Sequence, residues 1–162
     1  MKKIRLTQNK IALVDDEDFE WLNQYKWYAQ KGCHTFYAIR TIYKNNKPRT
    51  VRMHREILGL FFGDGLKIDH KNHNGLNNQK KNLRFATRSQ NAMNQKIRIT
   101  TSNYKGVSWH KGNKKWIAYI KINGKRLYLG LFNNEVEAAK IYDKEAKQLF
   151  GEYANINFRK ER

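Results

Sequence analysis

A strongly polar stretch in the middle of the chain constrains the fold most. Residues 68–84, IDHKNHNGLNNQKKNLR, contain two His, five Asn and four Lys or Arg, but only three apolar side chains. Such a stretch contains little that could fill a hydrophobic core, so its polar side chains call for another explanation. Leu83 and Phe85 then alternate with polar neighbours, and residues 87–90, TRSQ, form a capping-box pattern. The local order is therefore predicted as strand, long polar loop, strand and a helix that begins near Arg88.

The residues before this stretch favour strands and one short helix. Segments 10–30 and 35–53 are rich in β-branched and aromatic side chains, and residues 45–48, NNKP, are typical of a turn. Residues 53–63, MHREILGLFFG, predict a short helix. We expect one face of it to carry Ile57, Leu58 and Phe61, and Gly63 to end it.

The last third of the chain predicts a three-stranded sheet. Runs 104–110, 114–122 and 125–132 are strand-like, and they are joined by tight turns, KGNK and NGK. The Asn-Gly pair in the second turn is a strong hairpin signal. Apolar residues in these runs are expected to fill the core, namely Ile117, Ile120, Leu127, Leu129 and Phe132.

One helix is predicted to back this sheet. Asn134 and Glu137 form a capping pair at its start, and Gly151 is expected to end it. An apolar stripe at a spacing of three or four residues would face the sheet. Its members are Val136, Ala139, Tyr142, Ala146 and Leu149.

The charge of the chain indicates a polyanionic partner. The formal net charge is +19, from 33 Lys and Arg against 14 Asp and Glu. Residues 70–134 hold fourteen Lys or Arg and no acid, whereas a solvated surface normally mixes both signs. A membrane partner would need a basic amphipathic helix or a long apolar span, and the sequence has neither. The pattern therefore favours nucleic acid.

The cysteine content and the first residues bear on redox compartment and location. The single Cys33 excludes a disulfide within the chain and a cysteine-based zinc site. The opening residues, MKKIRLTQNK, lack the apolar segment of a signal peptide. We therefore expect the protein to act in the reducing cytoplasm.

The polar stretch also contains the side chains that phosphodiester hydrolysis requires. Hydrolysis needs a base that titrates near neutrality and a Lewis acid beside the phosphate. His70 can serve as the base. Asp69, and Asn91 on the predicted helix that follows the stretch, offer hard oxygen atoms that suit Mg²⁺ or a similar ion. Asn-rich loops also occur as ordinary turns, and an Asp-His pair alone is a weak signal, so the combined spacing is what favours a hydrolytic site.

The segment DHKNHNGLNNQKKNLRFATRSQNAMNQ resembles the HNH nucleases of phage and intron homing type, and the likeness extends upstream to MHREILGLFFG. The resemblance implies a ββα-metal (His-Me finger) fold. It implies that His70 is the general base, that Asp69 ligates the metal and that Asn82 tethers the loop. The third signature position is His in some members and Asn in others. Here it is Asn91, which is expected to be a second metal ligand. An Asn at this position leaves the identity of the divalent ion open; we favour Mg²⁺ over Mn²⁺ or another ion.

The segment from 102 to 158 resembles the ethylene-response-factor (AP-two) DNA-binding domain. Shared elements are Tyr-x-Gly-Val, Trp-x-Ala-x-Ile, Leu-Gly-x-Phe and Glu-Ala-Ala-x-x-Tyr-Asp. In that family the sheet reads the major groove, which implies DNA contacts from Lys105, Ser108, His110, Trp116, Tyr119, Lys121, Arg126 and Tyr128. Ser108 and His110 replace Arg of the plant proteins, and Tyr128 replaces Trp, so the plant target sequence does not carry over. Trp109 and Trp116 fit a core position as well as a DNA contact.

The sequence thus predicts an α+β chain with two modules. Residues 1–96 are expected to form an HNH nuclease domain with its ββα-metal core at about 50–95, residues 97–102 a linker, and residues 103–159 the AP-two-like domain. The predicted function is a metal-dependent DNA endonuclease of homing type, encoded by a mobile element such as a phage, with double-stranded DNA as partner and no small-molecule substrate. The alternative is a DNA-binding regulator with an inactive nuclease fold, and RNA binding is a weaker third. Oligomeric state and the number of strands cut stay open.

Overall fold

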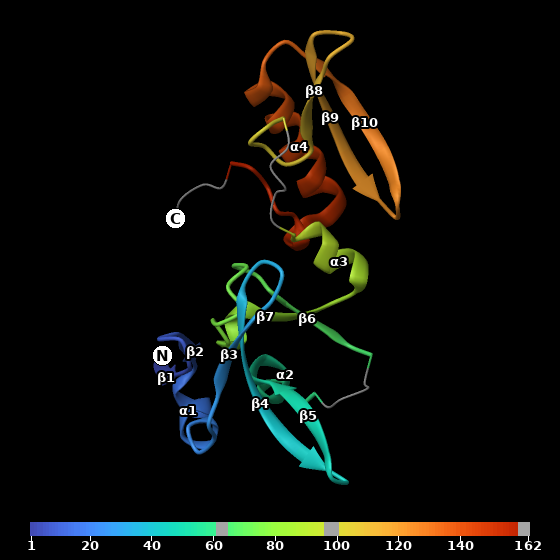
Figure 1. Ribbon diagram of the computed structural model, residues 1–162. Coiled ribbons are helices and arrows are strands. Elements are labelled where there is room, and N and C mark those ends of the chain that lie inside the picture. Colours follow the sequence, from blue (N-terminus) through green and yellow to red (C-terminus); the bar gives the residue numbers. More distant parts are fainter. Residues whose placement is uncertain (61–64, 96–100, 159–162) are drawn as a thin grey trace. The chain divides into compact units, whose positions relative to one another are not determined.

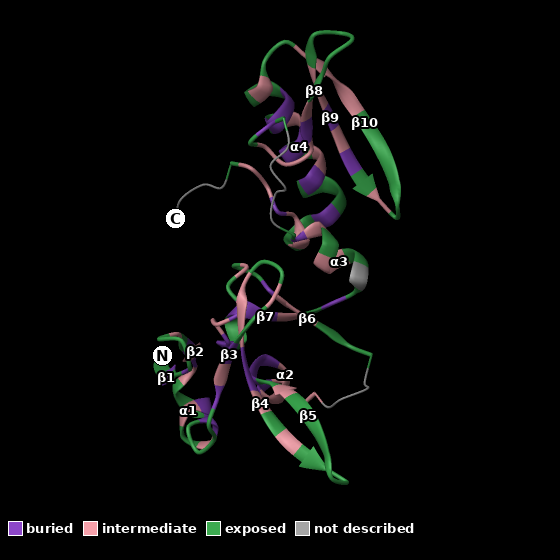
Figure 2. Ribbon diagram, in the orientation of Figure 1, coloured by how far each residue is buried: buried purple, intermediate pink, exposed green. Residues whose placement is uncertain are grey.

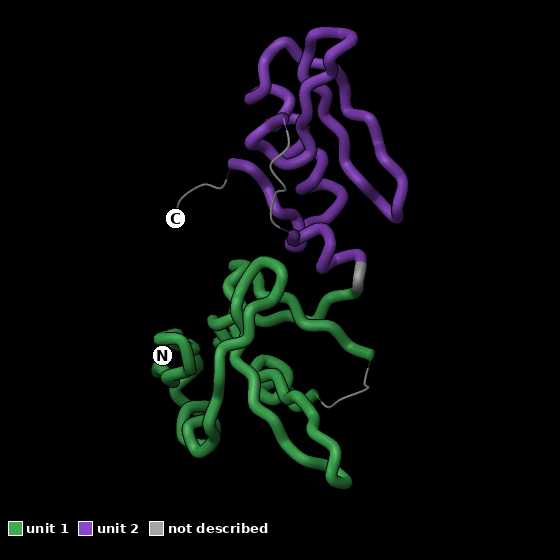
Figure 3. Tube along the Cα trace, in the orientation of Figure 1, with its two compact units in different colours: residues 1–88 green, residues 89–162 purple. Residues whose placement is uncertain are grey.

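The computed structural model of the protein describes residues 1–60, 65–95 and 101–158 (Figure 1). Several small sheets and a few helices make up the chain, which confirms the α+β class. Buried side chains gather in one cluster among the N-terminal elements and in two clusters around the last long helix (Figure 2). The chain divides into two compact units, Met1–Arg88 and Ser89–Arg162 (Figure 3).

Two small antiparallel sheets begin the first unit. Strand β1 (Lys2–Arg5) pairs with β2 (Ile11–Val14), while β3 (Tyr28–Lys31), β4 (Phe36–Lys44) and β5 (Lys47–Arg52) form a sheet in the order β3-β4-β5. Between β4 and β5, Asn45 and Asn46 have φ angles of 52° and 55°, a left-handed conformation that Asn tolerates in two-residue hairpins. The predicted strands are confirmed, and the turn falls on the first two of its four predicted residues.

Helix α1 (Asp16–Leu22) lies in a segment where the sequence predicts only strands. Its first turn contains Asp16, Glu17 and Asp18, whose charges are favourable at the positive end of a helix dipole. Leu22 at the other end is fully buried, and its carbonyl accepts a hydrogen bond of 2.8 Å from the Trp27 indole. The acidic cluster of the sequence is therefore a helix start.

Helix α2 (Met53–Ile57) is shorter than predicted. Gly59 has a φ of 65°, and its N–H donates to the Glu56 carbonyl, so the chain leaves the helix there rather than at Gly63. Met53 and Ile57 are buried in the core of the first unit, and Leu58 packs against it. The other two predicted features of this helix, Phe61 and Gly63, lie outside the described residues.

The predicted order of strand, polar loop, strand and helix is confirmed. Strand β6 (Lys67–His70) pairs antiparallel with β7 (Leu83–Ala86), a 3-10 helix η1 (Lys80–Asn82) ends the loop between them, and α3 (Arg88–Met93) begins at the expected residue. The loop is fixed to β2, since Leu13 N–H donates to the Leu76 carbonyl and Asn78 N–H donates to the Leu13 carbonyl, both at 2.8 Å. Helix α3 belongs to the second unit.

The second unit contains the predicted three-stranded sheet and helix. Strands β8 (Val107–His110), β9 (Lys115–Ile122) and β10 (Lys125–Phe132) pair antiparallel in the order β10-β9-β8. Asn123 and Gly124 have φ angles of 48° and 83°, as the Asn-Gly hairpin signal predicts. A bulge separates Tyr128 from Gly130 on β10.

Helix α4 (Glu135–Phe150) is capped as predicted and buries three of the five residues of the predicted stripe. The Asn134 side chain accepts from the N–H groups of Val136 and Glu137, and Gly151 follows the last turn with a φ of 51°. Val136 and Leu149 are exposed, at 37% and 45%. Ala139, Tyr142 and Ala146 are buried as predicted, and Ala138, Asp143 and Phe150 complete the buried stripe.

The sheet core agrees with prediction at three of five positions, because Ile117 lies on the face away from α4. Ile120 is buried, Leu129 and Phe132 pack against the clusters under the helix, and Ile117 is half-buried on the opposite side of β9. Leu127, close to the turn between β9 and β10, is 45% exposed, so the prediction that it fills the core is wrong. Of the helices in the described residues, none has the length and apolar content to cross a membrane. A 3-10 helix η2 (Gly151–Tyr153) follows α4.

Candidate functional site

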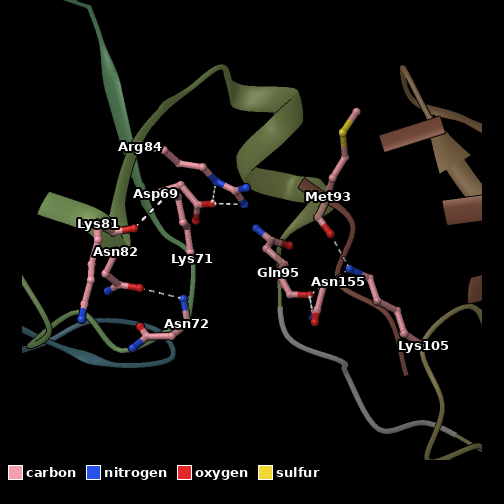
Figure 4. Close-up of polar contacts among 10 residues, drawn as sticks. All are labelled: Asp69, Lys71, Asn72, Lys81, Asn82, Arg84, Met93, Gln95, Lys105 and Asn155. Atoms are coloured by element: carbon pink, nitrogen blue, oxygen red, sulfur yellow. Dashed lines mark hydrogen bonds and ion pairs between the residues drawn. The ribbon is translucent and has the colours of Figure 1, made fainter. Parts of the chain in front are cut away.

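Asp69 and His70 occupy successive positions of β6, so their side chains project to opposite faces of the two-stranded sheet. Asp69 pairs across the sheet with Arg84, and its Oδ2 accepts from Arg84 Nε at 2.9 Å and Nη2 at 2.7 Å (Figure 4). The two side chains are only 11% and 9% exposed. The predicted metal ligand is thus held in place by a nearly buried guanidinium.

The His70 ring lies in a pocket of the first unit. It is 7% exposed, with the Tyr37 ring centroid 5.9 Å away and the His54 ring in an edge contact at 4.9 Å. Its Nε2 is 3.5 Å from Asn78 Oδ1. Burial lowers the pKa of His70 below its ordinary 6.5, against the opposing effects of Asn78 and Asp69. The imidazole is therefore held neutral at neutral pH, which is the form that accepts a proton.

His54 is a buried neighbour of His70 that the sequence does not single out. It is 6% exposed, and within the described residues its Nδ1 is without a hydrogen-bond partner. Burial lowers the pKa of His54 well below 6.5, and the charge of His70 and of nearby Arg52 and Arg55 adds to the effect. The position of this His next to the candidate base depends on the packing of α2 against β4 and is invisible in a linear pattern.

This burial predicts acid destabilisation of the first unit. The unfolded chain protonates His54 near pH 6.5 while the folded state resists it, so the free energy of unfolding is intact above about pH 6.5 and falls as the pH drops below it. His54→Phe keeps a flat ring and removes the titrating group. The free energy of unfolding of this variant, measured by urea unfolding, should therefore fall less steeply between pH 6.5 and 5 than that of the wild type. His34→Phe, at an exposed site of the same unit, is the control. Equal slopes in wild type and His54→Phe would contradict the prediction.

Asn82 braces the polar loop. Its side chain is 7% exposed. Oδ1 accepts from Asn72 N–H at 3.1 Å (Figure 4), and Nδ2 donates to the Asn77 carbonyl at 2.7 Å. One amide therefore connects two points of the loop that are five residues apart.

The acidic start of α1 also holds the loop. Asp15 accepts from the Gln79 side chain at 3.0 Å and from Lys80 N–H at 2.7 Å, and Glu17 pairs with the Lys80 ammonium at 2.6 Å. These contacts join residues more than sixty positions apart, so no local pattern could reveal them. The acids that stand out in a basic chain are therefore part of the support of the candidate site.

Asn91 lies half-buried on α3, in the second unit. In the described residues no group of three His, Cys, Asp or Glu side chains is placed to hold a metal. The donors proposed from the sequence, Asp69 and Asn91, are a carboxylate and an amide oxygen. Mg²⁺ is commonly bound through one or two protein oxygens and keeps several waters, so this donor chemistry fits that ion.

Lys105 holds the end of α3, which revises its assignment as a DNA contact. Its ammonium donates to the carbonyls of Met93 at 2.6 Å and Gln95 at 2.9 Å, and Asn155 Nδ2 donates to the same Gln95 carbonyl at 2.9 Å (Figure 4). A cation at the last carbonyls of a helix stabilises its negative end. Lys105 precedes β8 and is not part of a strand.

The sheet register sorts the other predicted DNA contacts into two faces. Val107, Ala118 and Ile120 lie on the face of the sheet that packs against α4. Side chains alternate between the two faces along each strand, so the residues next to these three, and the cross-strand partners of those residues, lie on the opposite face. Trp116 pairs with Trp109 and packs against the cluster under the helix, which revises its assignment as a DNA contact. The side away from α4, called the outer sheet face below, carries Ser108, His110, Lys115, Ile117, Tyr119, Lys121, Arg126, Tyr128 and Leu131.

The outer sheet face is basic and aromatic. Lys121 pairs with Arg126 across β9 and β10, Tyr119 pairs with Tyr128, and the Arg126 guanidinium lies 4.8 Å from the centre of the Tyr119 ring. Tyr128 is 58% exposed. No acidic residue occurs between positions 105 and 134, so this face has a single sign of charge.

Two parts of the chain are similar to known proteins. A family model of HNH endonucleases matches residues 51–93, which run from the end of β5 through α3. An uncharacterized HNH endonuclease, L560, of Acanthamoeba polyphaga mimivirus is 33% identical over 150 residues, which are 90% of this chain and 74% of the viral protein.

The C-terminal part is similar to plant proteins. The AP2-like ethylene-responsive transcription factor TOE2 of Arabidopsis thaliana is 38% identical over 61 residues, and dehydration-responsive element-binding protein 2C of the same plant is 41% identical over 56 residues. These segments are 38% and 33% of this chain but only 13% and 16% of the plant proteins. Because the viral relative is matched over most of both sequences, and because the matched segment contains the strands of Asp69, His70 and Arg84, the chain belongs to the HNH endonuclease family.

Proposed function

We propose that this chain is a metal-dependent DNA endonuclease of the HNH homing type, which hydrolyses phosphodiester bonds of double-stranded DNA. The observation that carries the proposal is the His70 pocket. A buried, neutral imidazole lies next to Asp69 within the segment that matches the HNH family. A neutral His at neutral pH has the protonation state and the basicity that general-base catalysis requires.

In the proposed reaction His70 removes a proton from a water molecule as the water oxygen attacks the phosphorus atom. The phosphorus bond to the leaving oxygen breaks, and that oxygen takes a proton from solvent, to which His70 then returns its own. A divalent ion, Mg²⁺ or Mn²⁺, stabilises developing negative charge as a Lewis acid when it is bound. Asp69 would be one of its ligands, and the Asn82 side chain braces the loop that leads out of β6.

The outer sheet face is the proposed DNA-binding surface. A three-stranded sheet of this width enters a major groove and presents alternate side chains to the bases. Ser108, His110, Tyr119, Lys121, Arg126 and Tyr128 are the proposed contacts. A nuclease tethered to such a surface is kept at high effective concentration near the bound site.

We expect Arg126→Ala to weaken duplex binding about 5- to 100-fold, the effect of losing one guanidinium contact to a base or phosphate. Fluorescence anisotropy at several salt concentrations measures it, and the slope of log affinity against log salt should fall by about 0.9 when the lost contact is to phosphate. Lys144→Ala, on the exposed side of α4, is the matched control. Equal losses in the two variants would rule out the outer sheet face.

Cleavage itself tests the proposal. The full chain is incubated with a random duplex library in Mg²⁺, in Mn²⁺ and in EDTA, and products are sequenced at nucleotide resolution. We expect cuts in the metal samples and none in EDTA. The pattern also shows whether one strand or both are cut.

One observation favours a second candidate, a DNA-binding regulator with an inactive nuclease fold. The Asp69 carboxylate accepts two hydrogen bonds from Arg84, so the guanidinium competes with a metal for that oxygen. In the regulator the outer sheet face binds DNA as before. Selective DNA binding with no cuts in either metal would support the regulator over the nuclease.

A further inference from the structure

Asn78 is a polar side chain that is completely buried, with 0% of its surface exposed. It belongs to the polar loop, and its backbone N–H donates to Leu13 on β2. An amide with no access to water is costly unless its oxygen and its nitrogen are both hydrogen-bonded. The partners of Asn78 therefore define what the residue does.

The partners determine which way the amide points. One amide atom lies 3.2 Å from the Leu76 carbonyl oxygen, and the same atom lies 3.4 Å from Met53 Sδ. A carbonyl oxygen can only accept a hydrogen bond, so this atom is the nitrogen, Nδ2. Oδ1 is then the atom that faces His70 Nε2 at 3.5 Å.

This orientation selects one form of the His70 ring. Because Asn78 Oδ1 only accepts, His70 Nε2 has to carry the hydrogen, and in the neutral ring the lone pair then belongs to Nδ1. Rotating the ring by half a turn would place a carbon opposite Oδ1 and lose the contact. The rings of Tyr37 and His54, with centroids 5.9 and 4.9 Å from His70, pack against it in the observed orientation.

We propose that Asn78 is a positioning residue, which holds His70 in the tautomer with hydrogen on Nε2 so that Nδ1 is the nitrogen that accepts the proton from water. The inference rests on the proposed role of His70 as general base and adds a residue that neither the motif nor the family match assigns to it. It also gives a reason for placing an amide, rather than an apolar side chain, at the centre of the first unit.

Long-range proton–nitrogen NMR of the ¹⁵N-histidine-labelled full chain reads the tautomer directly, without any cleavage. The spectrum is recorded at pH 8, above the ordinary pKa of His, and His70 is assigned by comparison with His70→Ala. We expect wild-type His70 to carry hydrogen on Nε2. A wild-type ring with hydrogen on Nδ1 would overturn the proposal.

Two substitutions that keep the branched shape of the Asn78 side chain separate positioning from packing. Asn78→Leu removes the hydrogen-bond acceptor, so His70 should become a mixture of the two tautomers. The single-turnover cleavage rate at saturating DNA should then fall roughly 10- to 100-fold, which is the usual effect of losing a residue that orients a functional His. The KM for DNA should not change. Asn78→Asp keeps an oxygen opposite Nε2 and should keep the tautomer, although it loses the donor to Leu76 and lowers the melting temperature.

The control is Asn23→Leu, the same change at an exposed Asn of the first unit outside the polar loop, which should leave the tautomer of His70 unchanged. An unchanged tautomer in folded Asn78→Leu contradicts the proposal. Should Asn78→Leu fail to fold, the wild-type and Asn78→Asp spectra decide the question. If the chain cuts no DNA in any metal, the proposed function fails while the tautomer measurement still tests the Asn78 contact.

Discussion

His70→Ala should reduce the rate of metal-dependent DNA cleavage by about 10²- to 10⁴-fold, the usual contribution of a general base. Binding to duplex DNA should stay within about 2-fold of wild type, because the proposed contacts lie on the outer sheet face of the second unit and His70 belongs to the first. Single-turnover cleavage and anisotropy on the same duplex measure the two effects separately. This separation of rate from affinity is what a base predicts and what a DNA contact does not.

The buried position of His70 requires a stability control. Removing a ring from a pocket that is 7% exposed leaves a cavity beside Tyr37 and His54, so the melting temperature is measured for each variant. His70→Gln fills more of the space and should lose activity to a similar extent. His34→Ala, an exposed histidine of the same unit, should cut as wild type does. A His70→Ala protein that is folded and cuts at the wild-type rate would end the proposed mechanism.

Local chemistry explains why some elements are predictable from sequence. Asn134 needs only two neighbouring N–H groups to cap α4, and Asn123-Gly124 needs only its own left-handed backbone to turn β9 into β10. The order of strand, polar loop, strand and helix around residues 67–93 likewise follows from alternation and capping patterns. In these cases the physical cause lies within a few residues of its effect.

Packing between distant segments explains what the sequence missed. Lys105 looks like a DNA contact by position in a motif, but its partners are the carbonyls of Met93 and Gln95, ten or more residues earlier. Val136 and Leu149 are apolar at the right spacing, yet the small Ala138 and the large Phe150 are the ones that α4 turns toward the sheet.

The candidate site shows the same limit. Asp69 and His70 are visible as a pair in the sequence, whereas the residues that set their properties are not. Arg84 reaches Asp69 through strand pairing, His54 reaches His70 from α2, and Asn78 acquires its orientation from Leu76 and Met53. A motif therefore predicts which atoms react, and the fold determines their protonation, orientation and partners.

Gly106→Ala should be among the most damaging substitutions in the second unit. Gly106 has a φ of 76°, and a Cβ there would lie 2.0 Å from Tyr142 Cδ2 and 2.8 Å from the Tyr119 carbonyl oxygen. Tyr142 is 3% exposed at the centre of the helix–sheet packing, and the Gly106 carbonyl accepts from Tyr119 N–H at 2.9 Å, so neither neighbour can move without loss. The left-handed backbone costs Ala about 1–2 kcal/mol and the overlap adds about 1–3 kcal/mol.

Gly124→Ala is the matched control, because Gly124 also has a positive φ, 83°, but no atom lies within 4 Å of its Cβ position. The free energy of unfolding should fall only by the cost of a left-handed backbone at Ala, about 1–2 kcal/mol. Native-state hydrogen exchange of the β9 amides measures the stability of the second unit in both variants. Since the outer sheet face exists only when β8, β9 and β10 are assembled, duplex affinity at 37 °C should fall steeply in Gly106→Ala and little in Gly124→Ala. Equal exchange rates in the two variants would mean that the Tyr142 ring does not pack over Gly106, and that the sheet is backed by α4 in some other way.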